Sequence, residues 1–296
     1  MRYVAWILIT SGGTHTQCTG TVVRPSVILT AAHCVVDPAT GRTLPARDFV
    51  VLTTGPNVNA GTTYAHSVGA ITHHPGYTVP TRRDDVALLR LTTPSTAHVV
   101  RLAGSPDTPW AYQVGRSALV AGFGEQRPRS QYSPTLNAVR LAVMSDSACA
   151  ARDVRGYPYV ATAMFCGAMP SSTKAICYGD SGGPVLETTA SGVVTEVGTT
   201  SFVSTATGAC PPPSYFVRLA TSAPWLSGQI VHLQLTSACP TLRVLSGREL
   251  ALIAQYRSDL RQRLAAATRR QVLAALAHAQ ALEARYRASL HSHACA

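Results

Sequence analysis

The hexapeptide Gly179-Asp180-Ser181-Gly182-Gly183-Pro184 is the most informative stretch of this sequence. Its serine lies in a turn whose two following glycines provide backbone freedom and leave room for a ligand. Such a turn can expose the serine hydroxyl while neighbouring N–H groups point to one place, which is the layout of an oxyanion hole. Ser-Gly-Gly alone would indicate an ordinary turn, so a catalytic interpretation requires a base and an acid elsewhere in the chain.

Two further stretches supply candidates for that base and that acid. His33 lies in the run Leu29-Thr-Ala-Ala-His-Cys34, and Asp85 stands directly before the apolar run Val86–Leu91. Taken alone, His33 is best interpreted as a structural histidine and Asp85 as a turn or cap residue. Together with Ser181 they form a different set, because an imidazole that titrates near neutrality can take the proton of a serine hydroxyl.

The strand pattern supports a β fold for most of the chain. From Tyr3 to about residue 218, short β-branched and alternating runs are separated by turns rich in Gly, Pro, Ser and Asn. This pattern predicts an all-β barrel or sandwich. The expected strands include Val4–Ile9, Thr21–Val23, Val27–Thr30, Phe49–Thr53, Val86–Leu91, Ala118–Ala121, Leu136–Val143, Val193–Val197 and Tyr215–Leu219.

The three motifs resemble those of the chymotrypsin-type (trypsin-like) serine proteases, in the family's order His, Asp, Ser and at the family's spacing. The resemblance runs from Tyr3 to Ile230. It implies two six-stranded antiparallel β-barrels with the site in the cleft between them. Residues 1–105 would form the first barrel, and residues 106–232 the second barrel with a terminal helix.

The resemblance also implies a role for each site residue. His33 would act as general base and then general acid, Asp85 would orient it, and Ser181 would attack the substrate carbonyl. The backbone N–H groups of Gly179 and Ser181 would hold the oxyanion. Ser201 would support the site by a hydrogen bond to Asp85.

The specificity pocket implied by the resemblance has no acidic residue. Ala175, six residues before the nucleophile, would lie at the base of the pocket, so a preference for Lys or Arg is disfavoured. Ile176 beside it is large and apolar. Val203 and Ser214 stand where the family usually has glycines, and they would narrow the pocket toward small or medium apolar side chains such as Ala or Val.

Asp180 is where the sequence departs from the family. In trypsin-type enzymes this aspartate pairs with a new ammonium group at an Ile-Val-Gly-Gly-like N-terminus, which this sequence lacks. A buried carboxylate without a partner is costly. A truncated start is the favoured explanation; the others are a substitute cation, with Arg116 as candidate, and a zymogen-like state. The alternative function is therefore a non-catalytic protease homologue that acts as a binding protein.

The eight cysteines favour disulfides over zinc, because none has Cys-x-x-Cys spacing. The resemblance implies the pairs Cys18–Cys34, Cys149–Cys166 and Cys177–Cys210. Disulfides indicate an oxidising compartment, so we expect a secreted protein, although residues 1–10 do not resemble a signal peptide.

Residues 233–296 differ in character and predict a helical appendage. Ala, Leu, Arg and Gln dominate after residue 246, and all are good helix formers. We expect an α-helical hairpin that turns near residues 266–268; the rival is one continuous helix. Only the hairpin would bring Cys239 and Cys295 close enough for a fourth disulfide.

Charge and motifs limit the partners. The chain has a net charge of +11, and residues 240–296 carry 9 arginines against 3 acidic residues. We favour a scaffold role for this basic tail; the alternative is docking to an anionic surface or a protein partner. The tail has no aromatic stacking pattern, so nucleic acid is not expected. No apolar run predicts a membrane span, no motif predicts a cofactor, and adjacent His73 and His74 do not predict a metal site. Protein or peptide substrates are expected.

Overall fold

A computed structural model describes residues 1–53, 57, 63–104, 109–127, 132–152, 157–169, 174–203 and 210–234, with isolated positions between 251 and 287. The chain divides into two compact units, Met1–Ile230 and Val231–Ala296. The first unit contains both predicted barrels.

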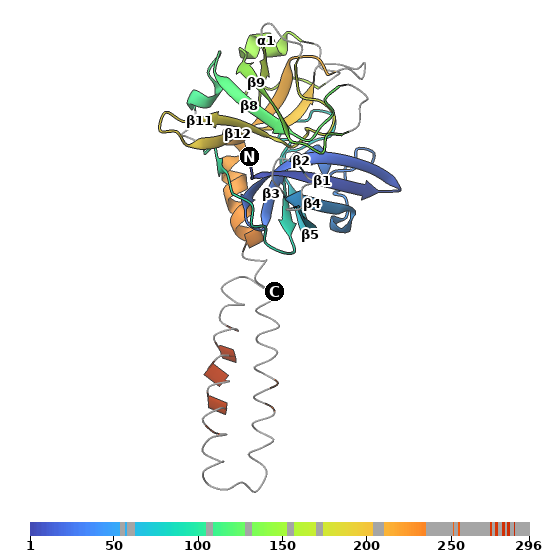
Figure 1. Ribbon diagram of the computed structural model, residues 1–296, viewed down its shortest axis with the longest axis vertical. Coiled ribbons are helices and arrows are strands. Elements are labelled where there is room, and N and C mark those ends of the chain that lie inside the picture. Colours follow the sequence, from blue (N-terminus) through green and yellow to red (C-terminus); the bar gives the residue numbers. More distant parts are fainter. Residues whose placement is uncertain are drawn as a thin grey trace. The chain divides into compact units, whose positions relative to one another are not determined.

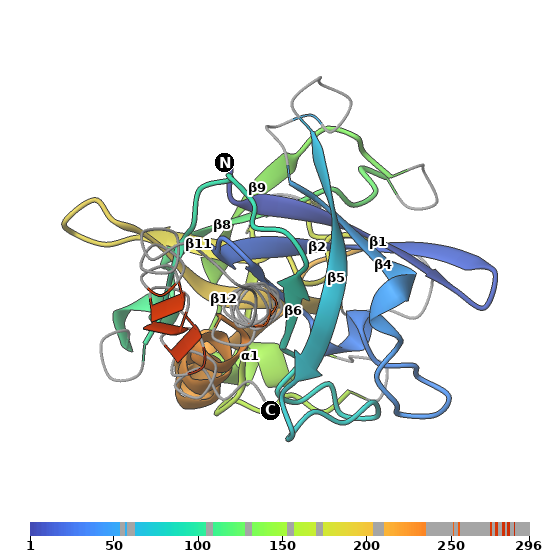
Figure 2. The ribbon, with the colours of Figure 1, turned by 90° about the horizontal axis from the view of Figure 1, so that it is seen from below.

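The first barrel is closed by six antiparallel strands in the order β1-β2-β3-β6-β5-β4 (Figures 1 and 2). Gly12 and Gly13, at φ angles of 57° and 80°, turn β1 into β2. Two consecutive left-handed residues fit a tight hairpin turn, which explains the Gly-Gly pair. The strands are β1 (Val4–Ser11), β2 (Thr14–Arg24), β3 (Val27–Thr30), β4 (Phe49–Thr53), β5 (Tyr64–His73) and β6 (Ala87–Leu91).

The second barrel follows the order β11-β8-β9-β10-β13-β12 and is closed by the pairing of β11 with β12. Its strands are β8 (Ser117–Gly122), β9 (Asn137–Val143), β10 (Met164–Ala168), β11 (Pro184–Thr188), β12 (Val194–Val203) and β13 (Ser214–Arg218). The two six-stranded antiparallel barrels confirm the predicted fold class. The short β7 (Arg101–Leu102), inside the range predicted for the first barrel, pairs in parallel with β12.

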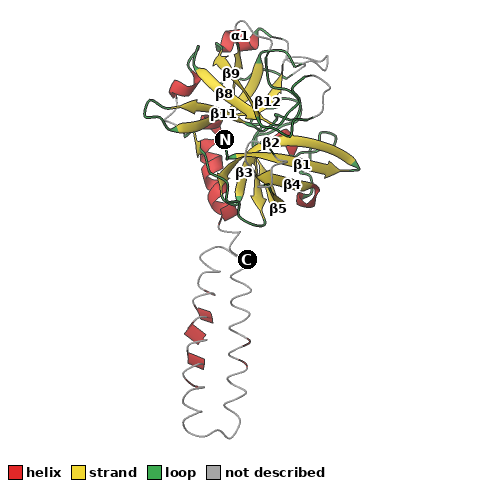
Figure 3. Cartoon of the chain, in the orientation of Figure 1, coloured by secondary structure: helices red, strands yellow, loops and turns green. Residues whose placement is uncertain are grey.

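Each barrel buries its own apolar core. In β1, Ile7 and Ile9 are buried while Leu8 between them is only partly so, which is the alternation expected of a strand with one face inside. Phe202 and Tyr215 stack at a centroid distance of 4.7 Å in the second barrel. Strands make up most of both barrels, as the yellow elements of Figure 3 show.

The two barrels are joined by side chains from both. Trp6 of β1 stacks on Phe123 at 5.7 Å. Gln17 of β2 accepts a 2.5 Å hydrogen bond from the Trp6 indole and donates one of 2.8 Å to the Phe123 carbonyl. These contacts fix the first barrel against the loop after β8.

A buried carboxyl group also lies at this interface. Glu196 of β12 is fully buried, and its Oε1 accepts a 3.3 Å hydrogen bond from Thr21 of β2. Its Oε2 has no hydrogen-bond partner among the described residues. Burial therefore raises the pKa of Glu196 well above its usual value.

The described residues up to position 234 form two α-helices. The short α1 (Asp146–Ala150) is capped by Ser145, and a longer helix covers residues 219–234. Trp225 of that helix packs edge-on against His74 at 5.1 Å. Within the described part of the chain, no helix is long and apolar enough to cross a membrane.

The described positions between 251 and 287 are helical, and Glu283 and Arg287 form a 2.7 Å ion pair one turn apart. The predicted hairpin turn near residues 266–268 and the Cys239–Cys295 bridge lie outside the described residues and stay predictions.

Candidate active site

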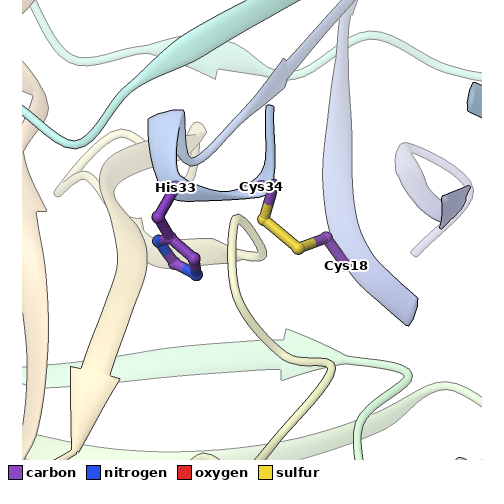
Figure 4. Close-up of side chains that lie close together, drawn as sticks. All are labelled: Cys18, His33 and Cys34. Carbon is purple, nitrogen blue, oxygen red and sulfur yellow. A yellow bond between two sulfur atoms is a disulfide. The ribbon is translucent and has the colours of Figure 1, made fainter. Parts of the chain in front are cut away.

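His33 is positioned by a short turn and a disulfide. It lies in the 3-10 turn Ala32–Cys34 after β3, and Cys34 is bonded to Cys18 of β2 (Figure 4). Its backbone N–H donates to Asp85 Oδ1 at 2.8 Å, and its Nδ1 lies 2.7 Å from Asp85 Oδ2. Two contacts to one carboxylate fix both the position and the orientation of the ring, which leaves Nε2 as the ring nitrogen for another partner.

Asp85 is fully buried just before β6, and its partners come from both barrels. Besides His33, its Oδ2 accepts a 2.5 Å hydrogen bond from Ser201 of β12, which confirms the predicted Ser201 contact. Arg82 NH1 lies 3.8 Å from the same oxygen. Burial alone would raise the pKa of Asp85, but His33, Arg82 and Ser201 outweigh it and hold the pKa below its usual value. Asp85 is therefore a buried anion.

The His33 ring is kept neutral by its surroundings. Its side chain is 15% exposed. Burial lowers the pKa of His33, Asp85 acts in the opposite direction, and the positive charge of Arg82 lowers it further, so that the net shift is downward. A neutral imidazole can accept a proton, which is what a general base requires.

The loop that carries Ser181 connects β10 to β11, and glycines shape it. Gly179 and Gly182 have φ angles of 93° and 80°, a region that favours glycine. A Cβ on Gly182 would collide with Thr30 and with Thr19 of the first barrel. Among the described residues, the N–H groups of Gly179 and Ser181 have no protein acceptor, so they remain available to a ligand.

Thr19 of β2 binds this loop from the opposite barrel. Its backbone N–H donates to the Ser181 carbonyl at 2.8 Å. Its buried hydroxyl donates to the Gly179 carbonyl at 2.8 Å and accepts from the Phe123 N–H at 3.2 Å. Thr19 therefore holds the backbone on both sides of Asp180.

The Asp180 carboxylate is bound by backbone N–H groups. Oδ1 accepts from Gly124 and Oδ2 from Cys177, each at 2.9 Å. Burial raises the pKa of Asp180 to about 6, and the two hydrogen bonds partly offset that rise. Arg116 is not its partner: it pairs at 2.9 Å with Glu187, because β8, which Arg116 precedes, lies beside β11. The suggested substitution of Arg116 for the ammonium group is wrong.

A pocket of about 250 Å³ contains the predicted base and nucleophile together. Of the four predicted pocket residues, Ile176 and Val203 line it. Ala175 instead lines a neighbouring cavity next to Asp180, and Ser214 is turned to accept a 3.2 Å hydrogen bond from the Ile176 N–H. The lining residues are His33, Arg82, Tyr157, Ile176, Cys177, Tyr178, Ser181, Ser201, Phe202 and Val203.

Comparison of the sequence with known proteins identifies the family. The sequence model of the trypsin family matches residues 1–226. The chain belongs to the trypsin family.

Among its relatives, chymotrypsin-like elastase family member 1 of Rattus norvegicus is 31% identical over 235 residues, which cover 76% of this chain and 82% of the relative. The chymase of Papio hamadryas is 28% identical over 231 residues, covering 76% and 84%. A trypsin of Saccharopolyspora erythraea is 30% identical over 171 residues, covering 57% and 70%. The trypsin-family relatives support a serine endopeptidase function.

Three disulfides stabilise this trypsin-family domain, and they are the pairs that the resemblance implied. They join Cys18 to Cys34, Cys149 to Cys166, and Cys177 to Cys210. Cys18, His33 and Cys34 come within 4.8 Å of one another, but both sulfurs are bonded to each other and cannot serve as thiolate ligands (Figure 4). The histidine beside the disulfide is not part of a zinc site.

Sequence reasoning missed several residues of the site. Arg82, Tyr157 and Tyr178 line the pocket, and none was singled out as a pocket residue. For Arg82 a signal existed, because Arg82-Arg83-Asp84-Asp85 is a run of charges directly before a buried strand. For Tyr157 no such signal existed, because its place beside the pocket depends on the path of a loop, which local sequence patterns do not predict.

Proposed function

We propose that the chain is a serine endopeptidase that cleaves peptide bonds through an acyl-enzyme, with Ser181 as nucleophile and His33 as base. The observation that carries the proposal is that His33 and Ser181 line one pocket, while the His33 ring contacts the buried Asp85. A weak nucleophile, a base and a group that orients the base are what the reaction needs in one place.

The steps follow from these groups. His33 Nε2 takes the proton of the Ser181 hydroxyl as the oxygen bonds to the substrate carbonyl carbon. Asp85 stabilises the imidazolium that forms. The N–H groups of Gly179 and Ser181 donate to the new oxyanion. The imidazolium then returns its proton to the amine as the peptide bond breaks, and water repeats the sequence on the ester to release the acid and free Ser181.

The apolar wall of the pocket supports a preference for small or medium apolar side chains before the cleaved bond. Ile176 and Val203 line a space of only about 250 Å³. An acidic residue that could bind Lys or Arg is absent from the described lining residues. We also propose that the protein is secreted, since its three disulfides persist in oxidising compartments.

Labelling with a fluorophosphonate probe tests the catalytic proposal. Ser181 should displace fluoride and become phosphonylated, whereas Ser181→Ala should not react and should lose turnover by about 10⁴–10⁶-fold. Ser191→Ala is the matched control, because Ser191 lies on an exposed turn between β11 and β12. Determining the N-terminal residue of the same labelled native protein shows which form of the chain reacts. A native protein that neither reacts nor cleaves would instead support the non-catalytic homologue.

Peptide esters that differ only in the residue before the cleaved bond test the preference. We expect Ala and Val esters to have higher kcat/KM than Arg or Lys esters. Much faster hydrolysis of the Arg ester would refute the assignment of the pocket and leave the catalytic proposal intact.

A further inference from the structure

Arg82 brings a fixed positive charge into the pocket that Ser181 and His33 line. It is the only Lys or Arg among the described lining residues, and its side chain is 20% exposed. The residue has a φ angle of 53°, so it lies in a turn just before Asp85. Left-handed backbone is uncommon for arginine, and here it belongs to the turn that brings the side chain to the pocket.

The guanidinium is held in place but not fully satisfied. Its carbon lies 5.1 Å from the centre of the Tyr157 ring, a cation–π contact. Its Nε and NH1 are buried and have no hydrogen-bond partner among the described residues. The nearest anion, Asp85 Oδ2, lies 3.8 Å from NH1, beyond hydrogen-bond distance.

Asp85 attracts this charge but does not hydrogen-bond the guanidinium. Its carboxylate already accepts hydrogen bonds from the His33 N–H, from His33 Nδ1 and from Ser201. It is also fully buried, whereas part of Arg82 is exposed in the pocket. A ligand in the pocket can therefore contact the positive charge of Arg82 but not the buried negative charge of Asp85.

We propose that Arg82 selects substrates with an acidic side chain close before the cleaved bond, next to the apolar residue that Ile176 and Val203 receive. The inference rests on the proposed endopeptidase function and names the substrate class of the same site. A substrate carboxylate would approach the open side of the guanidinium, while Tyr157 and Phe202 flank it. The rival role for Arg82 is that of a structural counter-ion to Asp85 alone.

Matched peptides test the selection in the wild-type enzyme. Each peptide has alanine before the cleaved bond, and Glu, Gln or Lys is placed in turn two, three or four residues before that bond. At one position or more, we expect kcat/KM for Glu to exceed that for Gln by about tenfold, and Lys to be the poorest. The preference should weaken as the salt concentration rises. Equal kcat/KM for the Glu, Gln and Lys peptides at all three positions would overturn the inference about Arg82. Hydrolysis of the peptides would still support the proposed endopeptidase function.

Variants separate Arg82 from the general charge of the protein. Arg82→Gln should reduce the Glu-to-Gln ratio to about one, and Arg82→Glu should reverse the preference toward Lys. A ratio taken within one enzyme cancels any effect of the substitution on the catalytic step. Arg83→Gln is the matched control, since Arg83 is adjacent, 57% exposed and paired with Asp84 at 3.3 Å outside the pocket. A Glu preference that persists in Arg82→Gln, or disappears in Arg83→Gln, would refute the assignment to Arg82.

Discussion

Replacing Thr19 with valine is expected to slow catalysis although Thr19 does not line the pocket. Valine keeps the shape of the side chain and the backbone N–H that binds the Ser181 carbonyl. It removes the hydroxyl that donates to Gly179 and accepts from Phe123. The Gly179 carbonyl would then lose the contact that holds the peptide between Gly179 and Asp180. The Gly179 N–H lies in the preceding peptide, so it would be disturbed indirectly, through the backbone angles of Gly179.

The magnitude follows from these two hydrogen bonds. A buried carbonyl and a buried N–H lose their partner, at about 1–3 kcal/mol each, so the free energy of unfolding should fall by about 2–6 kcal/mol. Complete loss of one oxyanion donor costs about 10²–10³ in kcat. Misalignment of a donor that is still present should cost less, and we expect kcat to fall by about 10–100-fold with little change in KM.

The assay compares three variants by steady-state kinetics and thermal unfolding. Thr19→Ser restores the hydroxyl and should keep kcat within about threefold of the wild type. Thr21→Val is the control: it removes a buried hydroxyl two residues away on the same strand, whose partner is Glu196. It should lower stability and leave kcat unchanged. Wild-type kcat in Thr19→Val, or equal loss in Thr19→Ser, would refute the reasoning.

Three further predictions concern the site and the barrel interface. Gly182→Ala should prevent stable folding or lower the melting temperature sharply, because its φ angle of 80° is unfavourable for alanine and its Cβ would meet the Ala31 N atom at 2.8 Å; a soluble variant with wild-type melting would contradict this. The acid limb of kcat/KM should lie below pH 6.5, because burial lowers the pKa of His33 and the base must be neutral. Arg82→Gln should move this limb to higher pH, because the charge of Arg82 also lowers the pKa of His33; a shift of the limb to lower pH would contradict this effect of Arg82. Glu196→Gln should raise the melting temperature at pH 8, by about 2–4 °C for each kcal/mol recovered. Because the pKa of Glu196 is raised in the folded state, its contribution to stability is full below the usual Glu pKa and is lost as the pH rises through the raised value. The gain from Glu196→Gln should therefore shrink toward pH 4, and an equal gain at both pH values would argue against ionisation as the cause.

Local patterns were enough to predict the strands and the contacts that the family's motifs encode. The alternation in Val4–Ile9 and the apolar run Val86–Leu91 correspond to β1 and β6. The His33–Asp85 and Ser201–Asp85 contacts were expected, because each residue stands in a short motif whose neighbours determine its place.

Contacts that lie outside these motifs could not be predicted in this way. Thr19 and Gly179 are 160 residues apart, and nothing near either residue indicates their hydrogen bond. Arg116 was assigned to the wrong carboxylate because the choice between Asp180 and Glu187 depends on which strand lies beside β8. Ala175 and Ile176 show the same limit on a smaller scale: both line the cavity next to Asp180, but only Ile176 also lines the pocket of His33 and Ser181.

The hydrogen bonds from Thr19 to the loop of Ser181 have a consequence for biosynthesis. A ribosome completes the first barrel, with His33, Asp85 and Thr19, before it adds the strands of the second barrel around Ser181. Ser181 is therefore the last of the three proposed catalytic residues to be synthesised, and the hydrogen bonds from Thr19 to the backbone around it can form only when its loop meets the first barrel. Between the synthesis of Asp85 and that of Ser181, 96 residues later, a nascent chain holds the proposed base and acid without the proposed nucleophile. The proposed site can therefore form only after residues of both barrels are present.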